Sequence, residues 1–273
     1  MRAGSTSYEN SFEPGILIGS EGEINESRVW IEGKVYEKNL MTKIYVSASI
    51  ACASPLCYGD TVVQLDRAGL DAYHFDICDG HFAPTFLLAP SLIRALRPLT
   101  NRRFDVHLYC THPSRYLDEL AACGADLVVV HIESQEDYPE LIRQIRVRGL
   151  KAGIAVLPDS TMPQDIANFL SEVSLVIANT VGPAYAGQPF DKRGLQNMAQ
   201  LSRIVRENNL DIEIGADGNV GVERLPDLFG AGCTHLVCGT SSVFKPDVEP
   251  GQALMTFQTE VALQSSREAN RER

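Results

Sequence analysis

Four side chains with metal-ligand chemistry lie in three short, strand-like segments of the sequence. His74 and Asp76 stand two residues apart in the first segment, His107 lies in the second, and Asp217 lies in the third. Imidazole nitrogens and carboxylate oxygens together form a borderline ligand set, which suits a divalent cation such as zinc, iron or manganese rather than calcium. The first hypothesis from these residues is a metal site.

An alternation of strand and helix patterns surrounds these residues. From about Lys43 the chain alternates short β-branched runs with amphipathic stretches, as in β/α units around a parallel sheet. We predict strands over residues 44–50, 72–77, 104–108, 127–132, 151–156, 175–179, 212–216 and 235–238. We predict helices over residues 58–68, 89–97, 113–123, 138–148, 163–173, 192–208, 222–231 and 251–265. Eight such units indicate an α/β fold, a (β/α)8 TIM barrel with functional groups at the C-terminal ends of its strands. A doubly wound open sheet is the alternative, but it does not account for eight units.

The period of a strand predicts where the candidate ligands point. His74 and Asp76 are two residues apart and therefore face the same side of their strand, as do Asp105 and His107. We expect the four candidate ligands at the mouth of the barrel, with Asp105 as a hydrogen-bond acceptor that orients an imidazole. We interpret His131, at the end of the fourth strand, as a satisfied core residue.

The composition excludes several classes of protein. A chain of 273 residues is long enough for one large barrel, and no apolar run approaches the roughly 20 residues of a membrane-spanning helix. The net charge of −11, from 24 Lys and Arg against 35 Asp and Glu, argues against a nucleic-acid surface. Seven scattered cysteines predict reduced, mostly buried thiols. We therefore expect a soluble, cytoplasmic protein whose partner is a small molecule, not a nucleic acid or a membrane.

The two ends of the chain differ from its middle. The first 40 residues are rich in Glu, Ser and Gly, and residues 27–36 alternate in part, which predicts a small hairpin or an edge strand. The alternative is an extension added upstream of a natural start at Met41. We predict an N-terminal extension over residues 1–40, a catalytic barrel over 41–265 and a charged, frayed tail over 266–273.

Several motifs match a known family in order and spacing. Residues 74–84 read H-x-D-x-x-D-G-H-F-x-P, which is similar to H-x-D-x-M-D-G-x-F-x-P, and residues 105–108 read D-V-H-L, as in D-V-H-L-M. Residues 180–188 and 217–220 are similar to T-V-x-P-G-F-G-G-Q and D-G-G-V. Ser49 matches the serine of an opening S-I-L, and residues 239–241 match a final G-S motif. Between about Ile44 and Phe244 the chain thus resembles the ribulose-phosphate 3-epimerase family.

The resemblance implies a site and a reaction. It implies one divalent ion (zinc, iron(II) or manganese) bound by His74, Asp76, His107 and Asp217, with the two aspartates also acting as acid and base on a ketose phosphate. Epimerisation beside a ketone removes a proton from one face, passes through a metal-stabilised enediolate and returns a proton to the other face, which calls for two carboxylates and one electrophile. The resemblance also implies a homo-oligomer.

Substrate-binding residues are expected on the loops at the barrel mouth. Barrels of this type often hold phosphate after their last strands, where backbone N–H groups converge. The predicted substrate-binding residues are Ser49, His107, Ala184, Gly187, Gln188, Gly218, Asn219, Gly239 and Thr240. Taken alone, Gly218 and Gly239 would be ordinary turn glycines.

The residues that line the predicted pocket depart from the family pattern. Cys78, Tyr109 and Asn179 stand where the family usually has methionines around the reacting carbons. Three loop glycines are replaced, by Ala184, Ala186 and Asn219. Residues 186–190 and 239–241 look closer to the allulose-6-phosphate epimerase branch.

These departures leave more than one function open. The first is a metal-dependent ketose-phosphate 3-epimerase that converts D-ribulose 5-phosphate to D-xylulose 5-phosphate, and the second is a 3-epimerase of another sugar phosphate such as D-allulose 6-phosphate. A non-catalytic barrel that binds sugar phosphate is the alternative from another class. A decarboxylase of the related barrel type is disfavoured, because residues 76–79 lack the lysine of its Asp-x-Lys-x-x-Asp motif.

Overall fold

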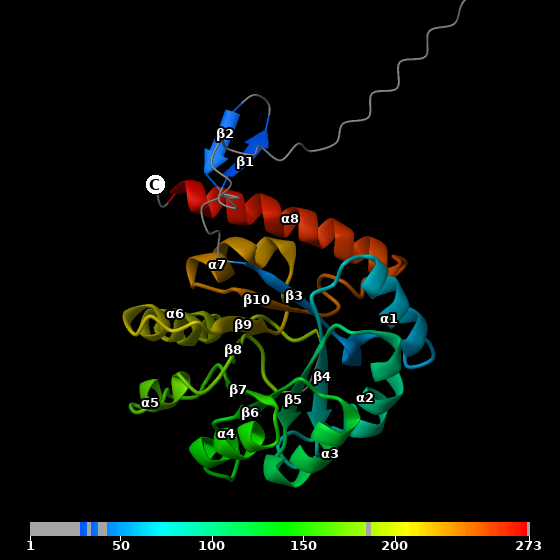
Figure 1. The fold of residues 1–273 in the computed structure, drawn as a ribbon, viewed down its shortest axis with the longest axis vertical. Helices are drawn as coiled ribbons and strands as arrows, with labels where there is room; N and C mark the ends of the chain where they lie inside the picture. Colours follow the sequence, from blue (N-terminus) through cyan, green and yellow to red (C-terminus); the bar gives the residue numbers. More distant parts are fainter. Residues whose placement is uncertain (1–27, 32–33, 38–42, 184–186, 272–273) are drawn as a thin grey trace, which may run out of the picture. The chain divides into compact units, whose positions relative to one another are not determined.

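A closed barrel of eight parallel strands forms the main body of the protein. The computed structural model describes residues 28–31, 34–37, 43–183 and 187–271. The strands follow one another in the order β10-β3-β4-β5-β6-β7-β8-β9 (Figure 1). They are β3 (Tyr45–Ser49), β4 (Ala72–Cys78), β5 (Arg103–Tyr109), β6 (Leu127–His131), β7 (Lys151–Val156), β8 (Leu175–Asn179), β9 (Glu213–Asp217) and β10 (His235–Cys238). The predicted (β/α)8 TIM barrel is confirmed, and each strand boundary lies within one residue of its predicted position.

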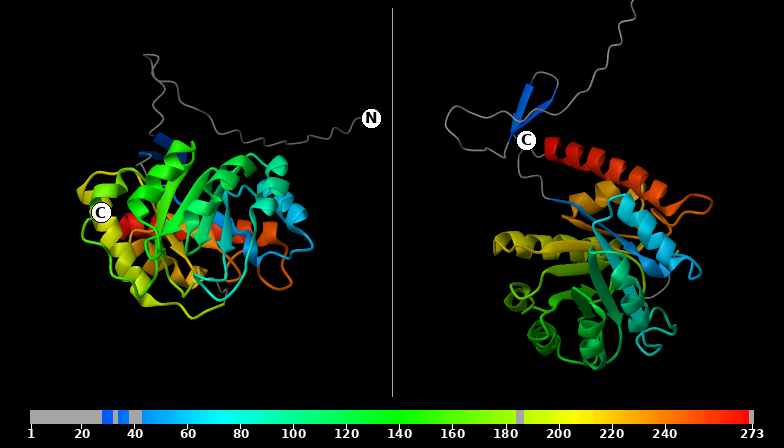
Figure 2. Two further views of the ribbon diagram at one scale, coloured as in Figure 1. Left: turned by 90° about the horizontal axis from the view of Figure 1, so that it is seen from below. Right: turned by 45° about the vertical axis from the view of Figure 1, so that its right-hand side comes forward.

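Helices surround this barrel on its outer side (Figure 2). They are α1 (Tyr58–Arg67), α2 (Pro90–Leu96), α3 (Leu117–Cys123), α4 (Tyr138–Val147), α5 (Ala167–Leu170), α6 (Lys192–Glu207), α7 (Leu225–Gly230) and α8 (Pro250–Arg271). Short 3-10 helices are η1 (Ile50–Cys52), η2 (Arg97–Leu99), η3 (Pro113–Tyr116) and η4 (Val222–Arg224).

Local signals in the sequence set several helix boundaries. The side chain of Asp137 accepts a hydrogen bond from Glu140 N at 3.2 Å and so caps the start of α4. Pro139 lies in the first turn, where a missing N–H is harmless. At its other end, α3 stops at Gly124, whose φ of +91° lies in the left-handed region that glycine tolerates.

Helices α3 and α7 begin later than predicted because 3-10 helices η3 and η4 take up their first turns, and α5 and α8 differ more in length from their predicted ranges. The predicted helix over 163–173 is wrong in extent, because bonds such as Ile166 N to Pro163 O and Val173 N to Leu170 O span only three residues and form turns. The prediction of a frayed tail is wrong over residues 266–271, where α8 continues. Gln264 donates to Glu268 Oε1 at 2.7 Å, one helical turn further on, and such i,i+4 pairs support a polar helix.

The remaining described residues belong to a separate unit. The chain divides into two compact units, residues 1–42 and Lys43–Arg273. In the first unit, β1 (Arg28–Ile31) and β2 (Lys34–Glu37) pair antiparallel, with Arg28 opposite Glu37. The barrel occupies the second unit.

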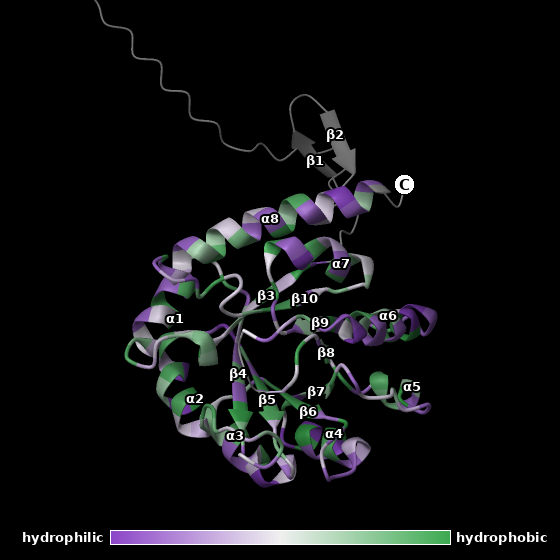
Figure 3. Cartoon of the chain, turned by 180° about the vertical axis from the view of Figure 1, so that it is seen from behind, coloured by the Kyte–Doolittle hydropathy of each residue, from purple (hydrophilic) through white to green (hydrophobic). Residues whose placement is uncertain are grey.

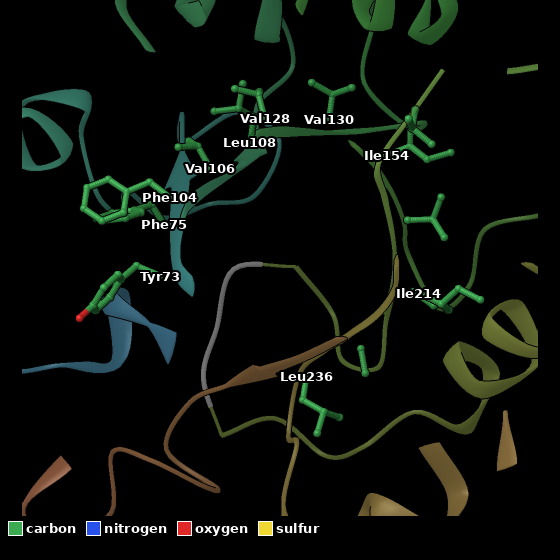
Figure 4. Packing of buried hydrophobic residues seen from close by; sticks show 14 of the residues in the cluster. Tyr73, Phe75, Phe104, Val106, Leu108, Val128, Val130, Ile154, Ile214 and Leu236 are labelled. Carbon is green, nitrogen blue, oxygen red and sulfur yellow. The ribbon is translucent and has the colours of Figure 1, made fainter. Parts of the chain in front are cut away.

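Alternation along the strands separates two hydrophobic layers. Every second residue of a strand packs outward against the helices, including Tyr73 and Phe75 of β4 and Phe104 of β5 (Figure 4). A second cluster fills the barrel interior: Leu127, Val129, Ala155, Leu175, Ile177 and Val237. The interior-facing residues of β4 and β5 are instead polar, and they include all the candidate ligands on these strands.

The distribution of hydropathy fits this layering. Strand β6 is largely hydrophobic, whereas α6 carries hydrophilic stretches (Figure 3). All seven cysteines lie in the described part of the chain and are free, and five of them are buried. Among the described residues, no helix has the length and apolar character needed to cross a bilayer.

Candidate active site

The C-terminal ends of β4, β5 and β9 bring the four predicted ligands together. His74 and Asp76 come from β4, His107 lies opposite Asp76 on β5, and Asp217 ends β9. Each residue offers one nitrogen or oxygen atom, and these four atoms all lie within 4.8 Å of one another. Three of the residues are buried and Asp217 is half-buried.

The separations between these atoms fit a small cation. His74 Nε2 lies 3.3 Å from both His107 Nδ1 and Asp76 Oδ1. His107 Nδ1 lies 3.3 Å from Asp217 Oδ2 and 3.8 Å from Asp76 Oδ1, and His74 Nε2 lies 4.0 Å from Asp217 Oδ2. Four ligand atoms at tetrahedral zinc distances stand about 3.3 to 3.4 Å apart. The cluster therefore has the donor chemistry and the size to hold a divalent ion.

The two histidines differ in protonation. Burial and the neighbouring imidazoles of His131 and His74 lower the pKa of His107 well below its usual value, so this ring is neutral. Burial also acts to lower the pKa of His74, but the charges of Asp76 and Asp217 outweigh it and raise this pKa to about 9. A cation that binds His74 must displace a proton, which ties binding to pH.

A hydrogen-bonded chain supports His107 from behind. His107 Nε2 lies 2.9 Å from His131 Nε2, and His131 Nδ1 lies 3.0 Å from Glu133 Oε2. An ionised carboxylate only accepts, so His131 donates from Nδ1 and accepts at Nε2, and His107 donates from Nε2. This tautomer directs the lone pair of His107 Nδ1 toward the cluster. The prediction that His131 is a satisfied core residue is confirmed, because it is fully buried and both ring nitrogens have partners. Its contact with His107 was not predicted, and the H-x-E spacing at the end of β6 is the signal that could have indicated it.

Asp105 contacts Arg103, and among the described residues no hydrogen bond joins it to an imidazole of the cluster, so its role in orienting an imidazole stays a prediction. Its Oδ1 lies 2.7 Å from Arg103 Nε, and Arg103 Nη1 lies 2.5 Å from Glu213 Oε1. His235 Nδ1 lies 2.6 Å from the other oxygen of Glu213. Two residues along a strand separate Asp105 from His107 by about 6 to 7 Å, and Asp105 lies opposite His74 on the neighbouring strand.

Each aspartate of the cluster accepts a hydrogen bond from a hydroxyl group. Ser49 Oγ donates to Asp76 Oδ2 at 2.6 Å, and Tyr109 Oη donates to Asp217 Oδ2 at 2.9 Å. Asn179 Nδ2 donates in turn to Tyr109 Oη at 2.8 Å. Burial and the charge of Asp217 raise the pKa of Tyr109 well above its usual range, so the phenol keeps the proton that it donates.

A cavity of about 110 Å³ opens over this cluster. Its lining includes both aspartates and six of the predicted substrate-binding residues: Ser49, Gly187, Gly218, Asn219, Gly239 and Thr240. Asn219 has a φ of +50°, a conformation that asparagine tolerates better than most residues. Its side chain accepts from Ser241 Oγ at 2.8 Å, which stabilises this loop.

The other predicted substrate-binding residues lie elsewhere. His107 belongs to the cluster beneath the cavity and is not part of the cavity lining. The side chain of Gln188 donates to Gly182 O at 2.9 Å and does not line the cavity either, so its contact with substrate stays a prediction. Ala184 lies outside the described residues.

Comparison with known proteins identifies the family. The model of the Ribulose-phosphate 3 epimerase family matches residues 45–244, a span that contains the whole cluster and the cavity lining. The chain belongs to the ribulose-phosphate 3-epimerase family. The family resemblance predicted from the motifs is confirmed, and with it the predicted enzyme class, an isomerase that acts as an epimerase.

Relatives of this ribulose-phosphate 3-epimerase family member cover most of the barrel. The ribulose-phosphate 3-epimerase of Bacillus subtilis (strain 168) is 33% identical over 199 residues, which cover 72% of this chain and 91% of the relative. That of Synechocystis sp. (strain ATCC 27184 / PCC 6803 / Kazusa) is 36% identical over 205 residues, covering 74% and 87%. The crystal structure of KGPDC from Streptococcus mutans aligns with a TM-score of 0.58 at 14% identity, over 81% of this chain and 99% of that one. At this identity the likeness concerns the fold alone.

Proposed function

We propose that this member of the ribulose-phosphate 3-epimerase family is a metal-dependent ketose-phosphate 3-epimerase that interconverts D-ribulose 5-phosphate and D-xylulose 5-phosphate. The supporting observation is that two carboxylates from non-adjacent strands, Asp76 on β4 and Asp217 on β9, line one cavity beside two buried imidazoles. A protein that only binds sugar phosphates needs no such pair of acid–base groups.

The two aspartates would exchange protons with the substrate. Inversion at C3 requires a base on one face of the carbon and an acid on the other. One aspartate removes the C3 proton as a carboxylate, and the other, in its protonated form, delivers a proton to the opposite face. Their roles exchange in the reverse reaction, and the hydroxyls of Ser49 and Tyr109 hold the two carboxylates in place.

We assign a divalent ion to His74, Asp76, His107 and Asp217. When bound, such an ion supplies Lewis-acid stabilisation of the negative charge that develops on the substrate oxygens. His107 is prepared for this role by its neutral ring and by the tautomer that His131 favours.

We assign the substrate phosphate to the loops of the cavity that follow β8, β9 and β10. Gly187, Gly218 and Gly239 bring backbone close to the cavity, and Thr240 adds a hydroxyl. The chain carries a net charge of −11, so attraction of an anionic substrate must come from local groups such as N–H donors.

Isotope exchange tests the proposal. The protein is incubated with D-ribulose 5-phosphate in deuterated water with Mn²⁺ or Zn²⁺, and C3 is followed by NMR. We expect deuterium at C3 together with D-xylulose 5-phosphate. Residues 186–190 and 239–241 favour D-allulose 6-phosphate as the second candidate, so it is assayed in parallel. Binding of ketose phosphates without exchange of C3 would favour a non-catalytic barrel.

A further inference from the structure

The hydroxyl of Tyr109, on β5, contacts two residues on the far side of the barrel, Asn179 and Asp217, which lie opposite each other on the adjacent strands β8 and β9. Asn179 Nδ2 donates to Tyr109 Oη at 2.8 Å, and Tyr109 Oη donates to Asp217 Oδ2 at 2.9 Å. A carboxylate only accepts hydrogen bonds and an amide NH₂ only donates them, so the direction of this chain is fixed. It runs from Asn179 through Tyr109 to Asp217, and Asn179 Nδ2 also donates directly to Asp217 Oδ2 at the longer distance of 3.4 Å.

Aromatic packing holds the Tyr109 ring in place. The side chain is 3% exposed, and its ring centroid lies 4.3 Å from that of His107 and 4.8 Å from that of His131. Phe82 adds an edge contact at 6.1 Å. The phenol therefore presents its hydroxyl to Asp217 from a rigid position.

The contact falls on the oxygen of Asp217 that faces the histidines. Asp217 Oδ2 lies 3.3 Å from His107 Nδ1 and also accepts the Tyr109 hydrogen bond. Asp76 is held differently, because its Oδ1 lies 3.3 Å from His74 Nε2 while Ser49 binds its other oxygen. Tyr109 thus fixes which oxygen of Asp217 faces the ligand cluster, and Oδ1 is left for proton exchange.

The family pattern has methionine at this position, and a thioether has no proton to donate. We propose that Tyr109, supported by Asn179, is a positioning residue that fixes the carboxylate of Asp217 both as a metal ligand and as an acid–base group. The effect on turnover rests on the proposed function, whereas the effect on metal binding follows from the geometry of the cluster.

Removing only the hydroxyl tests this role. Tyr109→Phe keeps the ring contacts, and Tyr73→Phe is a matched control, because Tyr73 is also buried and donates to Asp66 Oδ1 at 3.1 Å in the outer layer. Metal-free proteins are titrated with Mn²⁺, and kcat and KM are measured with D-ribulose 5-phosphate at saturating Mn²⁺. Tyr109→Phe is expected to weaken Mn²⁺ binding about tenfold and to lower kcat about 10- to 100-fold, with KM changed less than about threefold.

Two further variants sharpen the outcome. Tyr73→Phe should change neither Mn²⁺ affinity nor kcat, although it lowers the unfolding temperature. Asn179→Leu removes the donor to Tyr109 and the longer direct contact with Asp217, and it should lower kcat by roughly threefold to tenfold. Wild-type Mn²⁺ affinity and kcat in Tyr109→Phe, or equal losses in Tyr73→Phe, would overturn the positioning role.

Failure of this role and failure of the proposed function give different results. If the wild-type protein exchanges C3 of no ketose phosphate, the proposed function is wrong, and the Mn²⁺ titration alone decides the role of Tyr109. If the wild type epimerises and Tyr109→Phe matches it in both measurements, the proposed function stands and the positioning role is wrong.

Discussion

Replacement of His131 by phenylalanine should weaken metal binding, although His131 is not itself a candidate ligand. His107 and His131 are both fully buried, and their Nε2 atoms lie 2.9 Å apart. In His131→Phe the Nε2–H of His107 loses this acceptor. Without metal, His107 can move its proton to Nδ1, which lies 3.3 Å from Asp217 Oδ2.

When a metal is bound, His107 cannot move its proton to Nδ1, because Nδ1 must present a lone pair to the metal. The penalty for the unpaired N–H therefore falls mainly on the metal-bound state. An unpaired buried donor costs about 1 to 3 kcal/mol, which corresponds to about 5- to 150-fold in affinity.

Calorimetric titration of the metal-free protein with Zn²⁺ measures this effect. Glu133→Gln should weaken binding in the same direction but less, and the double variant should fall short of the sum because both residues act in one chain. His112→Phe, which removes a half-buried histidine outside the cluster, is the control. Wild-type Zn²⁺ affinity in His131→Phe, or an equal loss in His112→Phe, would refute the orientation of His107 by His131.

Three further outcomes are expected. Asp76→Asn and Asp217→Asn should each lower kcat by about 10² to 10⁴ or more, because either face of C3 loses its acid–base group; near-normal rates in both would contradict the two-carboxylate mechanism. Chelation followed by dialysis should abolish turnover and divalent metal should restore it, whereas activity in fully metal-free protein would leave the buried histidines without a function. Burial acts to raise the pKa of Glu213, but Arg103 and His235 lower it to about 2 from its usual 4.5. The contacts of ionised Glu213 with Arg103 and His235 therefore contribute up to about 3 kcal/mol to the free energy of unfolding above pH 4.5, and this contribution is lost as the pH falls toward 2. We expect the free energy of unfolding, measured by urea unfolding between pH 2 and 6, to fall less steeply with decreasing pH in Glu213→Gln than in the wild type. Parallel curves for variant and wild type would contradict this.

The barrel and the cluster of candidate ligands were predictable because each signal is local to one strand. The H-x-D spacing in β4 puts His74 and Asp76 on one face, and β-branched runs delimit the strands closely. Helix α5 was less predictable, since an amphipathic pattern does not distinguish a full helix from successive turns.

Contacts between strands were not readable from the sequence. His107 pairs with Val129 on β6, so the approach of His131 depends on the stagger between neighbouring strands. The pairing of strands likewise puts Asp105 opposite His74, where its carboxylate contacts Arg103. Tyr109 was recognisable as a departure from the family pattern, but its bond to Asp217 links β5 to β9, which are not neighbours in the barrel. Only closure of the barrel creates that contact.

The most direct test of the two-aspartate epimerase is the fate of the C3 hydrogen. Wild-type protein with Mn²⁺ and D-ribulose 5-phosphate in deuterated water should yield D-xylulose 5-phosphate that carries deuterium at C3. In Asp76→Asn and Asp217→Asn, measured in parallel, both formation of D-xylulose 5-phosphate and deuterium exchange at C3 should be far slower than in the wild type. Bound ketose phosphates, both pentulose and hexulose, that keep their C3 hydrogen in the presence of metal would contradict the proposed reaction.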